Sequence, residues 1–156
     1  ENLLFGDPDA SEERLWQALS LACFAEDIKR MPEGLETLVG EKGVSLSGGQ
    51  KQRLSLARAF LRRSDVLLLD DALSAVDAKT EQTIIANLKA MTDAPTSIIV
   101  THRLSAITDA DQVIVLEEGH VIQRGTHQEL IAVPGWYQEQ YYHQQLKEDD
   151  QDVLND

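Results

Sequence analysis

Leu46-Ser47-Gly48-Gly49-Gln50 opens a long stretch with helical periodicity, and the rest of the chain is organised around it. A serine and two glycines at a helix start leave backbone N–H groups unobstructed at the positive end of the helix dipole, where an anion can bind. Glycine allows the anion to approach the backbone closely, and the Ser47 hydroxyl can donate a further hydrogen bond. Taken alone, the stretch also fits a glycine-rich turn that only caps a helix.

The sequence after this helix predicts a strand, a helix and a second strand. Residues 66–69 (Val-Leu-Leu-Leu) are an apolar run typical of a strand buried on both faces. Residues 79–91 have the pattern of a helix, and Thr96–Val100 is expected to form a second buried strand. Because the connecting loops are short, the two strands should be parallel in a βαβ unit.

Three polar residues follow these two strands, at the edge where ligands gather in parallel α/β sheets. Asp70 and Asp71 come directly after the first strand, and His102 follows the second. A carboxylate at the end of an apolar strand is costly unless it meets a cation. The alternative for Asp70 is a strand-end carboxylate that caps the next turn.

The last third of the chain predicts a β-hairpin followed by helices. Residues 112–116 and 120–124 alternate between apolar and polar side chains on either side of a Glu-Glu-Gly turn. Helices are expected from about residue 125 and from residue 136 to about residue 147. The acidic tail beyond residue 147 is expected to be disordered.

Composition limits the classes of partner. The chain has 156 residues and a net charge of −13, so an acidic surface argues against nucleic acid or an anionic membrane surface as a direct partner. Its single cysteine, Cys23, cannot form a disulfide within the chain. No apolar run approaches the length of a membrane span, so we expect any link to a membrane to come from other segments.

Four motifs in this order resemble those of the ATP-binding cassette (ABC) ATPases. Residues 46–50 match the signature motif and residues 66–71 the Walker B strand; residues 74–77 (Ser-Ala-Val-Asp) match the D-loop, and His102 the switch histidine. Residues 1–6 (Glu-Asn-Leu-Leu-Phe-Gly) and 37–43 (Thr-Leu-Val-Gly-Glu-Lys-Gly) are similar to segments of ABC exporters. Residues 70–77 and 135–137 further resemble bacterial multidrug-resistance-like half-transporters of the Mdl type.

The resemblance implies an α/β fold, a partial P-loop NTPase-like (ABC ATPase) fold with parallel core strands. Residues 1–64 would form a helical subdomain that carries the signature, and residues 65–133 the C-terminal half of the ATPase core with its hairpin. Residues 134–156 would form the C-terminal helix and acidic tail. A P-loop, G-x-x-x-x-G-K-[ST], is missing, because Gly49 and Gln50 stand where Lys and Ser/Thr are required. We therefore expect a fragment of the domain that does not hydrolyse ATP alone.

The resemblance also assigns roles to single residues. In that family two ATPase domains meet head to tail, so Ser47, Gly48, Gly49 and Gln50 would contact the ATP of the partner domain. Asp70 would hold Mg²⁺, directly or through water, and His102 would contact the γ-phosphate. Asp77 would lie at the dimer interface, although it also suits a helix N-cap. Glu41 would lie near the coupling helices of the transmembrane domain, the alternative being a solvated loop carboxylate.

Asp71 departs from the family pattern, which places glutamate after the Walker B aspartate to polarise the attacking water. Aspartate is one methylene shorter, and a misplacement of about 1 Å can cost about a hundredfold in rate. The resemblance therefore implies a weakened catalytic base in this chain, beside an intact signature that would complete the site of a partner. The alternative is that Asp71 works as a short base in a rearranged pocket.

The function implied is that of an ATPase domain of an ABC exporter, with ATP and Mg²⁺ as cofactors. Its partners would be a second ABC ATPase domain, in a heterodimer of half-transporters, and the transmembrane domains of its own full-length chain and of the partner. The expected location is the cytoplasmic face of the bacterial inner membrane, and the cargo a small molecule or lipid. Two alternatives stay open: a regulatory nucleotide-binding module that dimerises with little hydrolysis, and a soluble ABC ATPase of DNA repair or translation.

Overall fold

The computed structural model describes residues 1–40, 43–91 and 93–153, with side chains described up to residue 147. The chain divides into two compact units, Glu1–Thr101 (unit 1) and His102–Asp156 (unit 2), and each is considered by itself. The predicted division of the chain at residues 64 and 133 stays a prediction.

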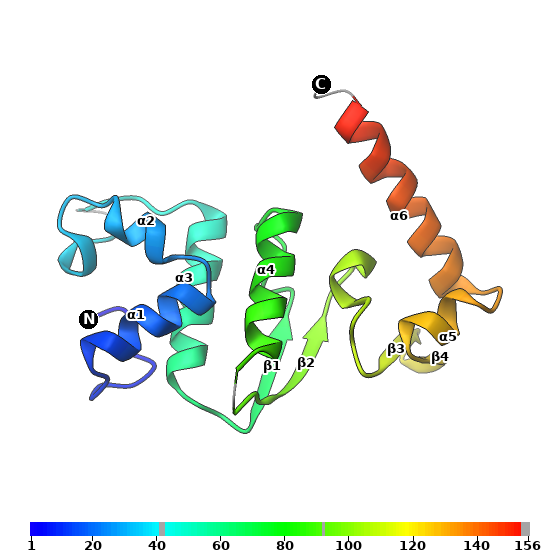
Figure 1. Ribbon diagram of the computed structural model, residues 1–156, viewed down its shortest axis with the longest axis horizontal. Helices are drawn as coiled ribbons and strands as arrows, with labels where there is room; N and C mark the ends of the chain where they lie inside the picture. The colour runs from blue at the N-terminus through cyan, green and yellow to red at the C-terminus, as the bar shows by residue number, and fades with distance from the viewer. Residues whose placement is uncertain (41–42, 92, 154–156) are drawn as a thin grey trace. The chain divides into compact units, whose positions relative to one another are not determined.

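The first half of unit 1 is helical. It contains α1 (Glu12–Leu21), α2 (Ala25–Lys29), the 3₁₀ helix η1 (Gly34–Glu36) and α3 (Gly48–Leu61). Helix α1 packs on α3 (Figure 1), and apolar side chains of both helices are buried, among them Leu19, Leu54 and Ala57. Arg14 of α1 strengthens this contact, because it donates a hydrogen bond of 3.1 Å to the carbonyl oxygen of Leu61 at the end of α3.

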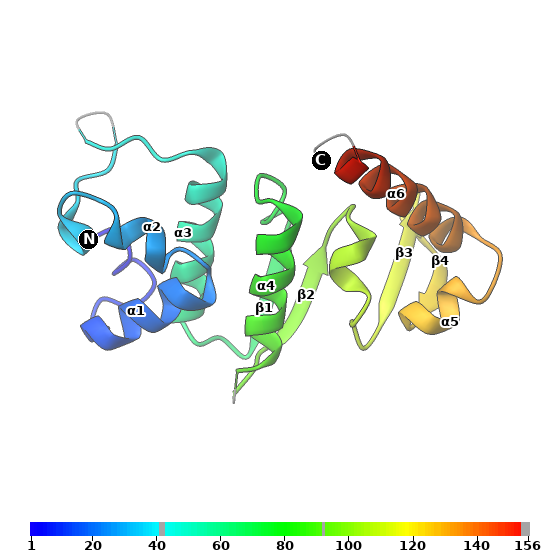
Figure 2. The ribbon, with the colours of Figure 1, turned by 45° about the horizontal axis from the view of Figure 1, so that its top comes forward.

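The second half of unit 1 is the predicted βαβ unit. Strand β1 (Val66–Asp70), helix α4 (Ala78–Lys89) and strand β2 (Thr96–Val100) follow one another, and the two strands pair in parallel. Asp70 is in register with Val100, so both strands end at the same edge. Figures 1 and 2 show α4 lying over one face of the strand pair. The parallel βαβ prediction is confirmed.

The burial predicted for these strands is wrong on one face. Leu67 and Leu69 are buried, but Val66, Leu68, Ile98 and Val100 are between 49% and 63% exposed. A strand directs alternate side chains to opposite faces, and α4 covers only one of them. The exposed face is apolar on both strands, so it has the composition of an internal surface without a covering layer among the described residues of unit 1.

Unit 2 contains the predicted hairpin and helices. The 3₁₀ helix η2 (Leu104–Ile107) precedes strands β3 (Val113–Glu117) and β4 (His120–Gly125), which pair antiparallel. The two residues between them, Glu118 and Gly119, have φ values of 49° and 78°. Positive φ at both central positions is the geometry of a type I′ turn, which matches the twist of a two-stranded hairpin. The hairpin prediction is confirmed.

Two helices complete unit 2. Helix α5 (His127–Ile131) begins with a capping box formed by Thr126 and Glu129, and α6 spans Trp136–Val153. The prediction that the helix ends near residue 147, before a disordered tail, is wrong, because α6 continues through most of the acidic run. No glycine or proline interrupts residues 137–153, so nothing in the local sequence breaks the helix. None of the helices in the described part of the chain combines the length and apolar character that a membrane span needs.

Tyr137 is the central side chain of the unit 2 core. It is fully buried against a cluster formed by Leu104, Val113, Val115 and Leu130. Its hydroxyl lies 3.0 Å from Nδ1 of His127, so its polar end has a partner. Burial raises the pKa of the Tyr137 hydroxyl above its usual value.

We expect Tyr137→Ala to destabilise unit 2 by about 3–5 kcal/mol, because it leaves a large cavity in the core. The matched control is Tyr142→Ala on the same helix, where the side chain is 51% exposed, and its effect should stay within about 0.5 kcal/mol. Each unit holds one tryptophan, so urea unfolding can be followed by Trp136 fluorescence in a Trp16→Phe background. Equal losses in both variants would contradict the burial of Tyr137.

Candidate functional site

The Leu46–Gln50 stretch forms the N-terminus of α3, as predicted. Ser47 is the N-cap, and its hydroxyl oxygen accepts from the N–H of Gln50 at 3.2 Å. The Gln50 side-chain oxygen in turn accepts from the N–H of Ser47 at 2.9 Å, which completes a capping box. The first-turn N–H groups of Gly48 and Gly49 have no acceptor within the helix itself. The Ser47 hydroxyl hydrogen remains available as a donor, since the cap uses only its oxygen.

The start of α3 is fastened to α2 by a polar cluster. Gln50 donates from its side-chain amide to Asp27 at 2.9 Å, and Arg53 forms an ion pair with the other Asp27 oxygen at 2.8 Å. Arg53 also donates to the carbonyl oxygen of Cys23, and its guanidinium lies 5.3 Å from the centre of the Phe24 ring. Because Asp27 and Arg53 are both largely shielded, this pair holds the helix N-terminus more firmly than an exposed ion pair would.

The first turn of α3 also packs directly on residues 74–77 of the same chain. A β-carbon at Gly49 would lie 2.7 Å from the carbonyl oxygen of Ala75, which leaves no room for any other residue there. A β-carbon at Gly48 would lie 3.5 Å from the nearest atom, the β-carbon of Ala75, in ordinary contact. The two glycines therefore differ: Gly49 is required by this packing, whereas Gly48 leaves the backbone open.

Gln52 joins the same two segments through its side chain. Its amide nitrogen donates to the Ser74 hydroxyl at 2.9 Å and to the Asp71 carbonyl oxygen at 3.4 Å, and its oxygen accepts from the N–H of Ala75 at 2.8 Å. The sequence analysis missed Gln52, Arg53 and Asp27. Polar residues on a helix usually face solvent, and their spacing carried no signal that set these three apart.

The two aspartates lie at the end of β1, as predicted, and both are exposed. Asp71 has a φ of 49°, and its N–H donates to the carbonyl oxygen of Val100 at 3.2 Å. Aspartate is among the few residues other than glycine that are enriched in this left-handed region. The residue that departs from the family pattern therefore suits the backbone on which it sits.

The acidic residues of the site fit Mg²⁺ that arrives with a nucleotide better than a metal held by protein alone. Within the described residues, no group of three or more metal-ligating side chains comes together. Mg²⁺ usually takes one or two carboxylates and completes its shell with phosphate oxygens and water. The exposed carboxylate of Asp70 at the strand end is compatible with that mode.

Asp77 is the N-cap of α4. Its carboxylate accepts from the N–H of Thr80 at 2.9 Å, so the capping alternative is confirmed. Hydrogen bonds from the side chain and backbone of Thr80 hold the pKa of Asp77 below its usual value. The proposed role at a dimer interface is compatible with capping, because Asp77 is exposed.

His102 is the exposed first residue of unit 2, whereas Asp70 and Asp71 belong to unit 1. Its expected place beside them therefore stays a prediction. The segment around it is anchored by Gln144 of α6, which donates to the carbonyl oxygen of His102 at 2.8 Å and accepts from the N–H of Leu104 at 2.9 Å. Sequence analysis missed Gln144 because it is distant along the chain. Glu41 lies outside the described residues.

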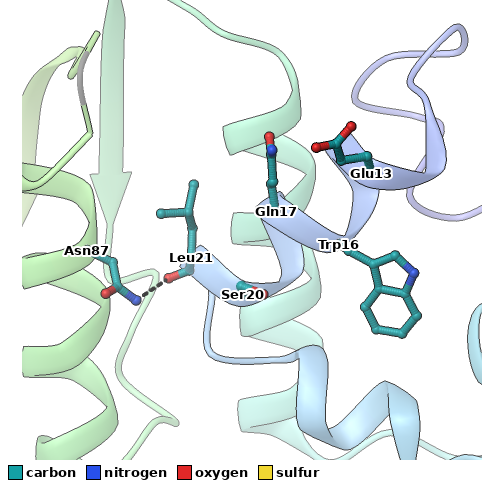
Figure 3. Close-up of a pocket in the computed structure, with 6 residues that line it drawn as sticks. All are labelled: Glu13, Trp16, Gln17, Ser20, Leu21 and Asn87. Atoms are coloured by element: carbon teal, nitrogen blue, oxygen red, sulfur yellow. Dashed lines mark hydrogen bonds between the residues drawn. The ribbon is translucent and has the colours of Figure 1, made fainter.

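A shallow groove between α1 and α4 is formed by other residues (Figure 3). Asn87 of α4 closes one end by donating to the carbonyl oxygen of Leu21 at 3.2 Å. The remaining lining comes from Glu13, Trp16, Gln17 and Ser20 of α1. None of the residues that the sequence analysis selected lines this groove. The candidate site is instead the α3 N-terminus with residues 70–77, which the Gly49 packing and the Gln52 hydrogen bonds bring together.

We expect Gly49→Ala to destabilise unit 1 by about 1–3 kcal/mol, since the new methyl group would collide with the Ala75 carbonyl. Gly48→Ala on the same helix turn should leave stability unchanged or raise it by up to about 1 kcal/mol, because it only restricts the unfolded chain. Urea unfolding followed by Trp16 fluorescence in a Trp136→Phe background compares the two. Equal effects would show that the close approach of Gly49 to Ala75 is wrong.

Known proteins are similar to this chain. The family model described as "ABC transporter" matches residues 8–74. The chain is 54% identical over 146 residues to a probable multidrug resistance ABC transporter ATP-binding/permease protein, YheI of Bacillus subtilis. It is 49% identical to the multidrug resistance-like ATP-binding protein MdlA of Escherichia coli. Each alignment covers 94% of this chain and 25% of the relative, so the chain spans about a quarter of the length of these proteins.

A solved structure agrees with the sequence relatives. A bacterial Atm1-family ABC exporter with ATP bound superposes with a TM-score of 0.82 and is 38% identical. The match covers 92% of this chain and 25% of that one. Fold, motif order and relatives point to one family: the chain belongs to the ATP-binding domains of ABC transporters, and its relatives are of the exporter type.

Proposed function

We propose that the full-length protein is an ABC exporter and that this chain is part of the domain in which it binds and hydrolyses ATP to drive efflux of a small molecule or lipid. The observation that carries the proposal is the capped N-terminus of α3. It presents first-turn N–H groups on two glycines, one of which is open to approach. A helix N-terminus of this kind favours phosphate oxygens through its dipole and its free donors.

In this proposal the site is shared between two domains arranged head to tail. Ser47, Gly48, Gly49 and Gln50 of this chain contact the ATP held by the partner domain. The exposed position of Ser47 and Gly48 supports this, because both are accessible to a ligand from outside the chain. ATP itself arrives with Mg²⁺, which would be held by Asp70 and would neutralise phosphate charge.

The chain's own nucleotide would be served by Asp71 and His102. Asp71 orients the attacking water and accepts its proton, and His102 donates to the γ-phosphate. Because the carboxylate of Asp71 is one methylene shorter than glutamate, we propose a weakened site that mainly holds ATP. An intact signature beside a weakened base indicates a heterodimer, in which the partner's site carries most of the hydrolysis.

Membrane attachment is proposed from the relatives. YheI is described as an ATP-binding/permease protein, and the chain covers a quarter of it. We propose that the full-length protein likewise carries a transmembrane domain, which contacts the segment around Glu41, and that this chain lies at the cytoplasmic face of the bacterial inner membrane. Without a P-loop, residues 1–156 alone would not turn over ATP. The same relatives favour transport over a soluble role in DNA repair or translation.

A regulatory module that binds ATP and dimerises with little hydrolysis is the second candidate. The short side chain of Asp71 favours it, because the main difference between the two functions is the strength of this base. Dimer formation with ATP at a negligible turnover rate would support the regulatory module. Turnover that rises in parallel with dimer formation would support the exporter.

Ser47→Arg should lower the total ATP turnover of the full-length transporter, assembled with its partner, about 100-fold. The bulky cation would remove the Ser47 donor and block the glycine amides, and losing one such donor typically costs a factor of this size. Ser55→Arg, at an exposed position of the same helix, is the matched control and should leave turnover unchanged. Unchanged turnover in Ser47→Arg would refute the role of this signature in the partner's site.

Asp71→Glu should raise turnover at the chain's own site about tenfold, because the longer carboxylate reaches the water. It is measured in a complex whose other site is silenced by Ser47→Arg, so that only the site of Asp71 contributes. Asp71→Asn, which cannot accept a proton, should abolish the remaining rate. If Asp71→Glu leaves the rate unchanged or lowers it, aspartate is an adequate base and the weakened-site proposal is wrong.

A further inference from the structure

We infer that Gln52 is a positioning residue that couples the two ATP sites through this chain. It would hold the backbone of Asp71 and the loop of residues 74–77 against the first turn of α3. The inference rests on the proposed function, because it requires the α3 N-terminus to serve one nucleotide and Asp71 another.

The three hydrogen bonds of Gln52 use both ends of its amide. The nitrogen reaches the Ser74 hydroxyl and the Asp71 carbonyl oxygen, at 2.9 and 3.4 Å, and the oxygen receives the N–H of Ala75 at 2.8 Å. Only an amide of this length offers a donor and an acceptor together at this distance from the helix. The side chain therefore clamps a loop across the turn that follows β1.

The Asp71 carbonyl oxygen accepts several of the hydrogen bonds that hold this loop. Besides Gln52, it accepts from the N–H of Ser74 at 3.4 Å and from the Ser74 hydroxyl at 3.0 Å. Asp71 also has a left-handed φ of 49°, and the hydrogen bonds on its carbonyl oxygen help to fix this conformation. Gln52 thus contributes to holding the residue whose carboxylate must meet the attacking water.

The other end of the clamp is the signature itself. Gln52 lies one turn after Gly48, on a helix whose first turn packs closely on Ala75 at Gly49. Its hydrogen bonds to Ser74 and Ala75 resist separation of the two segments. A shift of the α3 N-terminus on binding the partner's ATP would pull residues 71–75 with it. Occupancy of one site would in this way alter the placement of the base in the other.

The link itself is tested by hydrogen exchange in the full-length transporter. In Gln52→Leu, the Ala75 N–H loses its acceptor, and its exchange should accelerate about tenfold. Gln82→Leu, on the exposed side of α4, is the matched control and should leave this rate unchanged. Unchanged exchange in Gln52→Leu would overturn the inference.

The effect of the Gln52 hydrogen bonds on catalysis is tested by ATP kinetics in the same full-length transporter. In the Ser47→Arg background, where only the site of Asp71 contributes to turnover, we expect Gln52→Leu to lower kcat about tenfold with KM for ATP within about twofold. With Ser47 intact, Gln52→Leu should reduce the cooperativity of turnover with ATP. Loss of folding would instead change thermal stability and KM together. Gln52→Glu keeps the shape and the acceptor for Ala75 but cannot donate when ionised, so it should fold normally and still lose kcat.

Combining Gln52→Leu with Ser74→Ala tests whether Gln52 acts through the loop of residues 74–77. If Gln52 acts through the loop, the double variant should lose little more kcat than Gln52→Leu alone. Normal kcat in both Gln52 variants would overturn the inference, while a collapse of turnover in Ser47→Arg would leave the proposed function standing. A wild-type transporter without ATP turnover would overturn both.

Discussion

The close contact between the first turn of α3 and the carbonyl oxygen of Ala75 is the constraint on which unit 1 depends. Only glycine fits at position 49, because any β-carbon there would overlap a backbone atom that cannot withdraw cheaply. The contact places the segment that resembles the signature beside the segment that follows the Walker B strand. Both halves of the candidate site are thus carried on one rigid junction.

Polar interactions then orient this junction instead of adding much stability. The ion pair of Asp27 and Arg53 and the amide of Gln50 fasten α2 to the start of α3. Removing partly buried charges of this kind from water costs free energy, and the hydrogen bonds that each charge forms offset this cost. The cluster therefore fixes the direction in which the backbone N–H groups at the start of α3 point.

The strand pair of β1 and β2 has an apolar face that no other described residues of unit 1 cover. Four side chains that would be internal in a complete sheet are about half exposed. This agrees with a chain that spans a quarter of the length of its relatives. It also explains why residues 66–69 look like a strand buried on both faces although they are buried on one. The apolar composition of residues 66–69 is typical of a strand covered on both faces. Their burial is measured in this chain alone, which spans only part of its relatives.

Much of this protein followed from local sequence. Periodicity, turn residues and caps specify the elements near Gly48, Val66, Asp77 and Gly119, because hydrogen bonds within a few residues decide them. The order of the motifs likewise indicated the family. The tertiary structure alone decided that Gln52 reaches Ser74, that Gln144 holds the backbone of His102, and that Gly48 and Gly49 differ. These contacts join residues more than about a dozen positions apart, and their geometry depends on packing that no local pattern records.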